Sequence, residues 1–175
     1  DVFDMMRDHY EGTPMDMTTD IGAGGSHLPY RWRPMDFTVD GIEYSQERAI
    51  ATQQTGFWFV AQARKNLPDH IGGVIWFGTD DAATSPLTPI YCGTTDVPES
   101  LAEGTADMLT YSDKSMFWVT NRIAQFAYLR YDHIGKEVRT VIDEWENSMI
   151  DALKKQDKVL AEMSPKKMTK KATEW

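Results

Sequence analysis

The sequence lacks several features that would assign it to a common class of protein. It contains a single cysteine, Cys92, which excludes an intrachain disulfide and a zinc site built from several cysteines. No run of about 18 apolar residues is present, so we expect no transmembrane helix and no membrane partner. An excess of positive charge is also absent. The net charge of −9 argues against a nucleic-acid-binding protein whose affinity comes from phosphate contacts.

The beginning of the chain lacks both an initiator methionine and a signal-peptide pattern, because it reads Asp1-Val2-Phe3-Asp4. The apolar spacing over residues 1–10 predicts a helix, and no N-cap residue precedes it. We therefore expect the chain to be a processed protein or a part of a longer one. A cytoplasmic and an exported parent protein are both compatible with this sequence.

Aromatic residues are plentiful, with 6 Trp, 7 Tyr and 7 Phe in 175 residues, which is typical of a folded domain rather than a disordered chain. The first half of the chain shows strand patterns. Asp40-Gly41 predicts a two-residue hairpin turn. The runs 48–62 and 72–79 are apolar and β-branched, and they predict an antiparallel pair. Residues 84–94 are a third strand candidate, which two prolines confine to an edge.

The second half of the chain shows helical patterns. Asp113 is the candidate N-cap of a first helix. An amphipathic helix then covers 134–163, and Pro165 follows it. Residues 164–175 carry four lysines against one glutamate, so we predict a basic, disordered tail. Because strands come first and helices follow, the sequence predicts an α+β fold.

Few residues form a pattern typical of a metal site or a catalytic nucleophile. The four histidines are widely separated and show no ligand spacing, so we predict no metal site and expect surface or capping roles for them. Cys92 lies in an apolar run, which favours a buried structural cysteine over a nucleophile. Asp80-Asp81 follow a predicted strand. They would serve as an acid–base pair or a cation site, with turn capping as the more common role.

Two pairs of polar residues are candidates for substrate binding. Arg31 and Arg33 flank a tryptophan in an irregular segment, 11–36, that is long for a compact domain. Such an arginine binds a carboxylate or stabilises developing negative charge, and the alternative is a surface or cation–π contact. Gln53 and Gln54 precede an apolar run. If they lie in a strand, one of them points inward, where its amide would bind the sheet or a substrate.

Five segments of the sequence, in consistent order over roughly residues 1–163, resemble the C-terminal part of the bacterial cysteine dipeptidases of the dipeptidase A type. These segments are RDHYEGTPMDMT at 7–18, PYRWRP at 29–34, ERAIATQQTGFWFVAQAR at 47–64, WFGTDDAATSPLTPIYCG at 76–93 and FWVTNRIAQFAYLRY at 117–131. Together they are far more specific than any single motif.

The resemblance implies an N-terminal-nucleophile hydrolase related to penicillin V acylase and the secernins. It implies a four-layer αββα sandwich that needs no cofactor and cleaves dipeptides of many sequences. An N-terminal Cys would be the nucleophile, and its own α-amino group, which titrates near neutrality, would be the base. Asp1 is not a Cys, and Cys92 matches an internal family segment. The resemblance therefore implies that residues 1–163 are the C-terminal part of such a domain and lack its nucleophile.

Two hypotheses follow from this resemblance. In the first, the chain is the C-terminal part of a cysteine dipeptidase and is inactive without the missing N-terminal portion. In the second, it is a non-catalytic binding or assembly module built on the same scaffold. Part of a layered fold would expose the apolar face that its missing half covers, so we also expect a homo-oligomer.

By analogy with the acylases, Arg31 is the first candidate, and Arg33 the second, for stabilising charge in the transition state. In a dipeptidase that contains this segment, Arg31→Ala is expected to lower kcat by on the order of 10²-fold, because a preorganised cation is lost. Steady-state kinetics on a dipeptide measure this, with Arg33→Ala as the neighbouring variant. Turnover near that of the wild type would remove Arg31 from the site.

Overall fold

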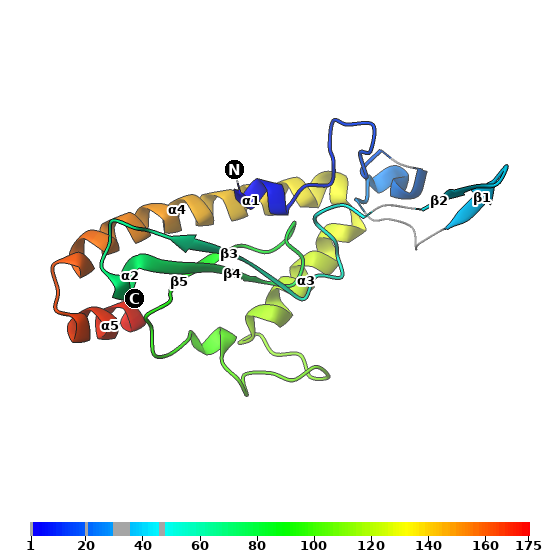
Figure 1. Ribbon diagram of the computed structural model, residues 1–175. Helices are drawn as coiled ribbons and strands as arrows, with labels where there is room; N and C mark the ends of the chain where they lie inside the picture. Colours follow the sequence, from blue (N-terminus) through cyan, green and yellow to red (C-terminus); the bar gives the residue numbers. More distant parts are fainter. Residues whose placement is uncertain (1, 20, 30–35, 46–47) are drawn as a thin grey trace.

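A computed structural model describes residues 2–19, 21–29, 36–45 and 48–175 (Figure 1). The α-helices are α1 Val2–Met6, α2 Asp69–Gly72, α3 Met116–Leu129, α4 Lys136–Ala161 and α5 Pro165–Glu174. The strands are β1 Phe37–Val39, β2 Ile42–Tyr44, β3 Phe57–Ala63, β4 Gly73–Thr79 and β5 Thr88–Tyr91. Short 3₁₀ turns cover Ile21–Ser26 and Glu99–Leu101, and a π-turn covers Tyr131–Gly135. None of the described helices is long and apolar enough to cross a bilayer.

The main sheet contains three antiparallel strands in the order β3-β4-β5. Phe57 pairs with Thr79 and Ala63 with Gly73, and on the other side of β4, Val74 pairs with Tyr91. These strands precede the long helices, which confirms the predicted α+β class. The prediction was wrong for residues 48–56, which lie outside β3.

The predicted hairpin at Asp40-Gly41 is confirmed. β1 and β2 pair across these two residues, and both have positive φ, 52° at Asp40 and 79° at Gly41. Two left-handed residues in succession define the turn whose twist matches that of an antiparallel pair. Phe37 and Tyr44 stack across the hairpin with ring centroids 5.3 Å apart.

One face of the main sheet packs against the C-terminal helices. Trp58 of β3 and Trp76 of β4 lie in a buried cluster with Leu153 and Leu160 of α4. Figure 1 shows α4 running alongside the three strands. Because alternate strand residues point to opposite faces, the Trp residues face these helices, and their sequence neighbours face away. The C-terminal part of the helix stripe predicted over 134–163 therefore packs in the main core, whereas Val141 and Trp145 of the same predicted stripe are exposed.

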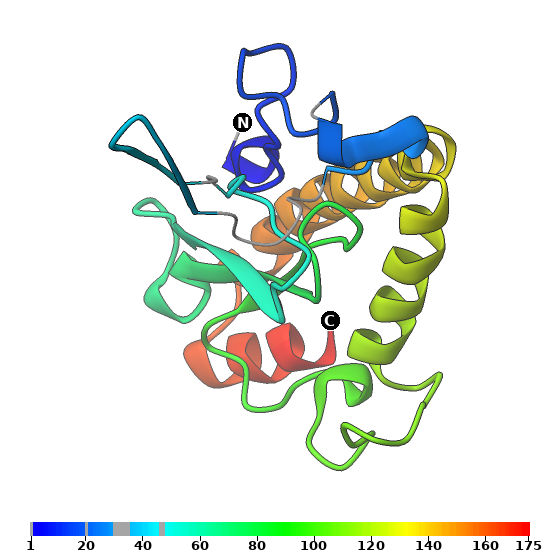
Figure 2. The ribbon, with the colours of Figure 1, turned by 90° about the vertical axis from the view of Figure 1, so that its right-hand side faces the viewer.

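The opposite face of the sheet is apolar and exposed. Phe57 is 63% exposed and Phe59 is 51% exposed, and their cross-strand partners include Phe77. α3 stands at one side of this sheet in Figure 2. We call Phe57, Phe59 and Phe77 the open apolar face. An apolar surface of this kind is typical of an interaction site.

The C-terminal segment differs from the predicted disordered tail, because residues 165–174 form α5. Pro165 occupies the first turn of α5, where its missing N–H costs nothing. Met168 and Ala172 lie one turn apart and are both buried against the main core. Trp175 packs on Tyr91 at 5.5 Å between ring centroids. The lysines indicated a solvated tail, but they cover only the outer side of an amphipathic helix.

A buried ion pair joins the N-terminal segment to α4. Arg7 donates to both carboxylate oxygens of Glu146, at 2.6 and 3.1 Å, and both side chains are nearly inaccessible to solvent. Arg7 also donates to the backbone oxygens of Ala82 and Ser85, and Glu146 accepts the backbone N–H of Leu87 at 2.8 Å. The pair therefore fixes loop 80–87 as well as the two elements that carry the charges.

We predict that Glu146→Ala lowers the free energy of unfolding by about 3–5 kcal/mol, because it leaves the guanidinium of Arg7 buried without its counter-ion. Urea unfolding followed by circular dichroism measures this change. The matched control is Glu144→Ala, at an exposed position of the same helix, which should change stability by no more than about 0.5 kcal/mol. Equal effects of the two substitutions would contradict the prediction.

Candidate functional site

A polar cavity of about 390 Å³ lies where β4 ends, between the turn before β3 and α3. We call it the carboxamide cavity, because four of its nine lining residues carry an amide side chain. It is lined by Gln53, Gln54, Asp80, Asp81, Asn121, Ala124, Gln125, Tyr128 and Leu129. The structure thus brings together the Gln pair and the Asp pair that the sequence singled out separately.

Asp80 is the most unusual residue of this cavity. It follows β4 directly, has a positive φ of 67°, and donates its N–H to the carbonyl of Gly56 at 2.9 Å. A carboxylate oxygen accepts from Asn121 Nδ2 at 3.2 Å. Burial raises the pKa of Asp80 to about 6; the Asn121 hydrogen bond opposes the shift, and the charge of Asp81 adds to it. A strained backbone and a raised pKa often mark functional positions.

Asp81 has a structural role beside it. Its carboxylate is buried and accepts hydrogen bonds from the backbone N–H of Ala83 and from the hydroxyls of Thr84 and Tyr128. The ring of Tyr128 stacks on Tyr131 with centroids 5.6 Å apart. The turn-capping alternative therefore describes Asp81, and Asp80 has no cationic partner among the residues that the structure describes.

The structure does not confirm the predicted positions of the other candidate residues. Gln53 and Gln54 lie in a turn closed by the Thr55 N–H on the Thr52 carbonyl, so the expected strand alternation is wrong for them. Arg31 and Arg33 lie outside the described residues. Cys92 was predicted to be buried, yet it is exposed just after β5, because the ladder ends there.

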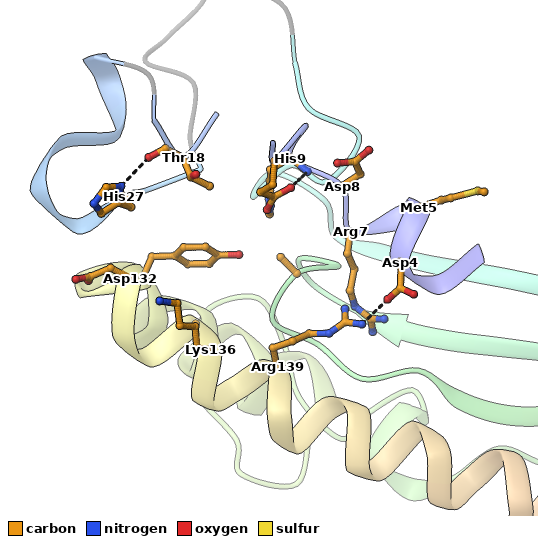
Figure 3. A pocket seen from close by; sticks show the side chains of 14 residues that line it. Asp4, Met5, Arg7, Asp8, His9, Thr18, His27, Asp132, Lys136 and Arg139 are labelled. Carbon is orange, nitrogen blue, oxygen red and sulfur yellow. Dashed lines mark hydrogen bonds and ion pairs between the residues drawn. The ribbon is translucent and has the colours of Figure 1, made fainter. Parts of the chain in front are cut away.

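A second hollow, the N-terminal cleft, has a volume of about 900 Å³. Figure 3 shows its two walls: the segment after α1 with His9 and Asp8 on one side, and the start of α4 with Lys136 and Arg139 on the other. Tyr131 also lines this cleft. Since Tyr131 stacks on Tyr128, the two rings stand between the cleft and the carboxamide cavity.

His9 and Glu11 form a pair inside this cleft. His9 is 2% exposed, and its Nδ1 lies 3.2 Å from Glu11 Oε1. Burial acts to raise the pKa of Glu11, but the hydrogen bonds from the His9 ring and backbone outweigh it, so this pKa lies below its usual value. Glu11 is then a carboxylate that only accepts, and Nδ1 must carry the hydrogen. The sequence predicted a surface or capping role for His9 and missed this pair.

The described residues contain no cluster of three or more His, Cys, Asp or Glu side chains arranged to hold a metal ion. The polar groups that line the two hollows include carboxylates, carboxamides, two imidazoles, tyrosine hydroxyls and the cationic side chains of Arg7, Lys136 and Arg139. These groups bind the polar backbone and the charged ends of a peptide by hydrogen bonds and ion pairs.

A family model described as peptidase family C69 matches residues 1–144. The chain belongs to this family. The match begins before the N-terminal cleft and extends into α4, so it includes all the residues of both hollows. The sequence resemblance to dipeptidases is thereby confirmed.

A curated relative supports the same assignment. The chain is similar to a protein named "Probable dipeptidase" from Latilactobacillus sakei, with 25% identity over 111 residues. This alignment covers 62% of the chain but 23% of the relative. The chain therefore spans about a quarter of the length of the curated relative that it matches.

The raised pKa of Asp80 can be tested through the pH dependence of the protein's stability. Because the folded pKa of about 6 exceeds the ordinary value of 3.8, the contribution of Asp80 to stability is complete below pH 3.8 and is lost as pH rises through 6. Asp80→Asn removes this titration. The stability of the variant relative to wild type should therefore increase by on the order of 1 kcal/mol between about pH 4 and pH 6.

Urea unfolding at several pH values measures this difference. Asp113→Asn, at an exposed position before α3, is the matched control, and its stability relative to wild type should not depend on pH in this way. Parallel pH profiles for wild type and Asp80→Asn would show that Asp80 titrates normally in the folded protein.

Proposed function

We propose that this chain is the C-terminal part of a broad-specificity dipeptidase whose N-terminal Cys nucleophile lies in a segment outside this sequence. The supporting observation is the family match over residues 1–144, together with the similarity to a probable dipeptidase. In this proposal the thiolate of the N-terminal Cys attacks the peptide carbonyl, and its own α-amino group takes the thiol proton.

The open apolar face supports this proposal. Phe57 and Phe59 project from a sheet whose other face is already packed against α4 and α5. In the proposed enzyme, a second sheet from the rest of the domain covers this face, which gives the central layers of an αββα sandwich. Covering these aromatic side chains would contribute to the stability of the whole domain through burial of apolar area.

The carboxamide cavity supplies polar groups beside that face. The Nδ2 or Nε2 groups of Asn121 and Gln53 are donors of the kind that bind a substrate carbonyl or stabilise an oxyanion. Asp80 has no cationic partner among the described side chains, and its carboxylate suits the α-ammonium group of a dipeptide. In the proposed enzyme, Asp80 therefore recognises the free N-terminus of the substrate, and the amides orient its peptide bond.

The second candidate function is a non-catalytic binding or assembly module. The same open apolar face favours it, because a second copy of the chain would cover that face in a homo-oligomer. The two candidates differ in what covers Phe57 and Phe59. In the first it is the N-terminal part of the same domain, and in the second it is another chain.

We predict that the purified 175-residue chain does not hydrolyse dipeptides, because the nucleophile is absent and Cys92 lines neither the cleft nor the carboxamide cavity. A panel of dipeptides, assayed by release of free amino acids, measures this. The longer protein, with an N-terminal Cys exposed upstream, should be active and should lose activity with a thiol reagent.

The control for this experiment is Cys92→Ser in both proteins, which should leave each result unchanged. Thiol-dependent activity of the short chain that disappears in Cys92→Ser would contradict the proposal. An inactive longer protein, together with a stable homo-oligomer of the short chain, would favour the assembly module.

A further inference from the structure

A third cavity, of about 440 Å³, lies between α1, the main sheet and α4. We call it the α1 cavity, and none of the described residues lines both this cavity and one of the two hollows above. Figures 1 and 2 show α1 lying beside α4. The floor of the α1 cavity is apolar and is formed by Phe3 of α1, Val60 of β3, Trp76 of β4, and Ile150 and Leu153 of α4.

At the α1 cavity the main core reaches the surface. Trp76 and Leu153 are buried members of the core cluster, and Phe3 packs on Trp76 with ring centroids 5.2 Å apart. Val2 and Lys154, which also line the cavity, are exposed. The cavity is therefore open to solvent, and it offers a ligand an apolar surface that is continuous with the core.

The charged side chains that line the α1 cavity are Arg64, Asp157 and Lys154. Arg64 and Asp157 neutralise each other, with Nη1 donating to one carboxylate oxygen at 2.7 Å, while the other oxygen accepts the hydroxyl of Tyr91 at 2.8 Å. The ammonium group of Lys154 lies 3.3 Å from Asp151, which is outside the cavity, and both of these side chains are well exposed. An exposed ion pair contributes little free energy, so the lining carries one cation that is available to a ligand.

The amide of Gln62 adds a donor to this cation. Its Oε1 accepts the indole N–H of Trp76 at 3.1 Å, so the NH₂ group is its remaining polar atom, and no described residue accepts a hydrogen bond from it. The acceptor oxygens of Asp157 and Gln62 already have donors. The polar side-chain groups left for a ligand are therefore an ammonium and an amide NH₂, both of which only donate.

We propose that the α1 cavity binds an amphipathic carboxylate, that is, a fatty acid of medium chain length. Its hydrocarbon chain lies on the apolar floor against Phe3 and Trp76, and its carboxylate accepts hydrogen bonds from Lys154 and Gln62. A cavity of about 440 Å³ with mostly apolar walls and a few polar groups is typical of a small-molecule site. The site has no free carboxylate for an ammonium group, so it differs in its ligand from a peptide site and does not depend on dipeptidase activity.

The binding test uses the 175-residue chain and NMR titration with octanoate, decanoate, 1-decanol and decylamine, each below the concentration at which it forms micelles. Decanoate should produce saturable shift changes at residues 60–62, 76 and 150–154. It should bind about tenfold more tightly than octanoate, because each buried methylene group strengthens binding about fourfold. Decylamine, which is cationic at neutral pH, should bind at least about tenfold more weakly than decanoate, because its charge repels Lys154.

A variant of Lys154 tests the charged end of the site. Lys154→Ala should weaken binding of decanoate about tenfold and leave binding of 1-decanol unchanged, because the alcohol has no charge to pair. Lys155→Ala is the matched control. It removes the same charge from the next position of α4, which is exposed and does not line the cavity, so it should leave the affinity for decanoate unchanged.

The proposal is overturned if decanoate gives no saturable shift at the α1 cavity, if decylamine binds as tightly as decanoate, or if Lys154→Ala and Lys155→Ala behave alike. Shift changes confined to Phe57 and Phe77 would place the hydrocarbon chain on the open apolar face and would also overturn it. None of these measurements uses peptidase activity, so failure of the proposed function and failure of this site are distinguishable.

Discussion

The ion pair between Arg7 and Glu146 is the interaction on which the rest of the structure depends. It connects a segment near the N-terminus to a helix 139 positions later, and its spare hydrogen bonds hold the carbonyls of Ala82 and Ser85. Arg7 also lies over the Trp58 ring, 4.6 Å from its centroid. Burying two charges is favourable only when every lone pair and proton has a partner, and here loop 80–87 supplies those partners.

Both hollows are consequences of this arrangement. The loop that Arg7 holds begins with Asp80 and Asp81, so its fixed path sets the position of the carboxamide cavity. The segment that carries Arg7 continues into Asp8 and His9, so the same anchor sets one wall of the N-terminal cleft. A charged pair in the core therefore positions two hollows that are lined by different residues.

The sequence predicted those parts of the fold that depend on local patterns. The hairpin at Asp40-Gly41 follows from two residues that tolerate positive φ, and the stripe of α4 follows from helical spacing. The turn at Thr52–Thr55 was missed, because β-branched and aromatic neighbours favour a strand, whereas hydrogen bonding across the turn decides the outcome. α5 was missed because only two of its residues are buried, and its four lysines dominate the composition.

The candidate site was predictable only in part, because it depends on contacts between residues that are far apart in the sequence. Gln53, Gln54 and Asp80 were recognised as unusual one by one, but only the folded chain shows that they share a cavity. The pair of His9 and Glu11 has no signal of its own in the sequence, since it depends on a turn in which Tyr10 has a φ of 65°. Long-range partners such as Arg7 and Glu146 leave no periodic pattern that a single sequence could reveal.

The stacked rings of Tyr128 and Tyr131 have a thermodynamic consequence. One ring lines the carboxamide cavity and is tied to Asp81 through its hydroxyl, and the other lines the N-terminal cleft. Any ligand that shifts one ring changes the packing surface of the other. If a bound ligand does so, the affinities at the two hollows are linked, and such linkage is reciprocal.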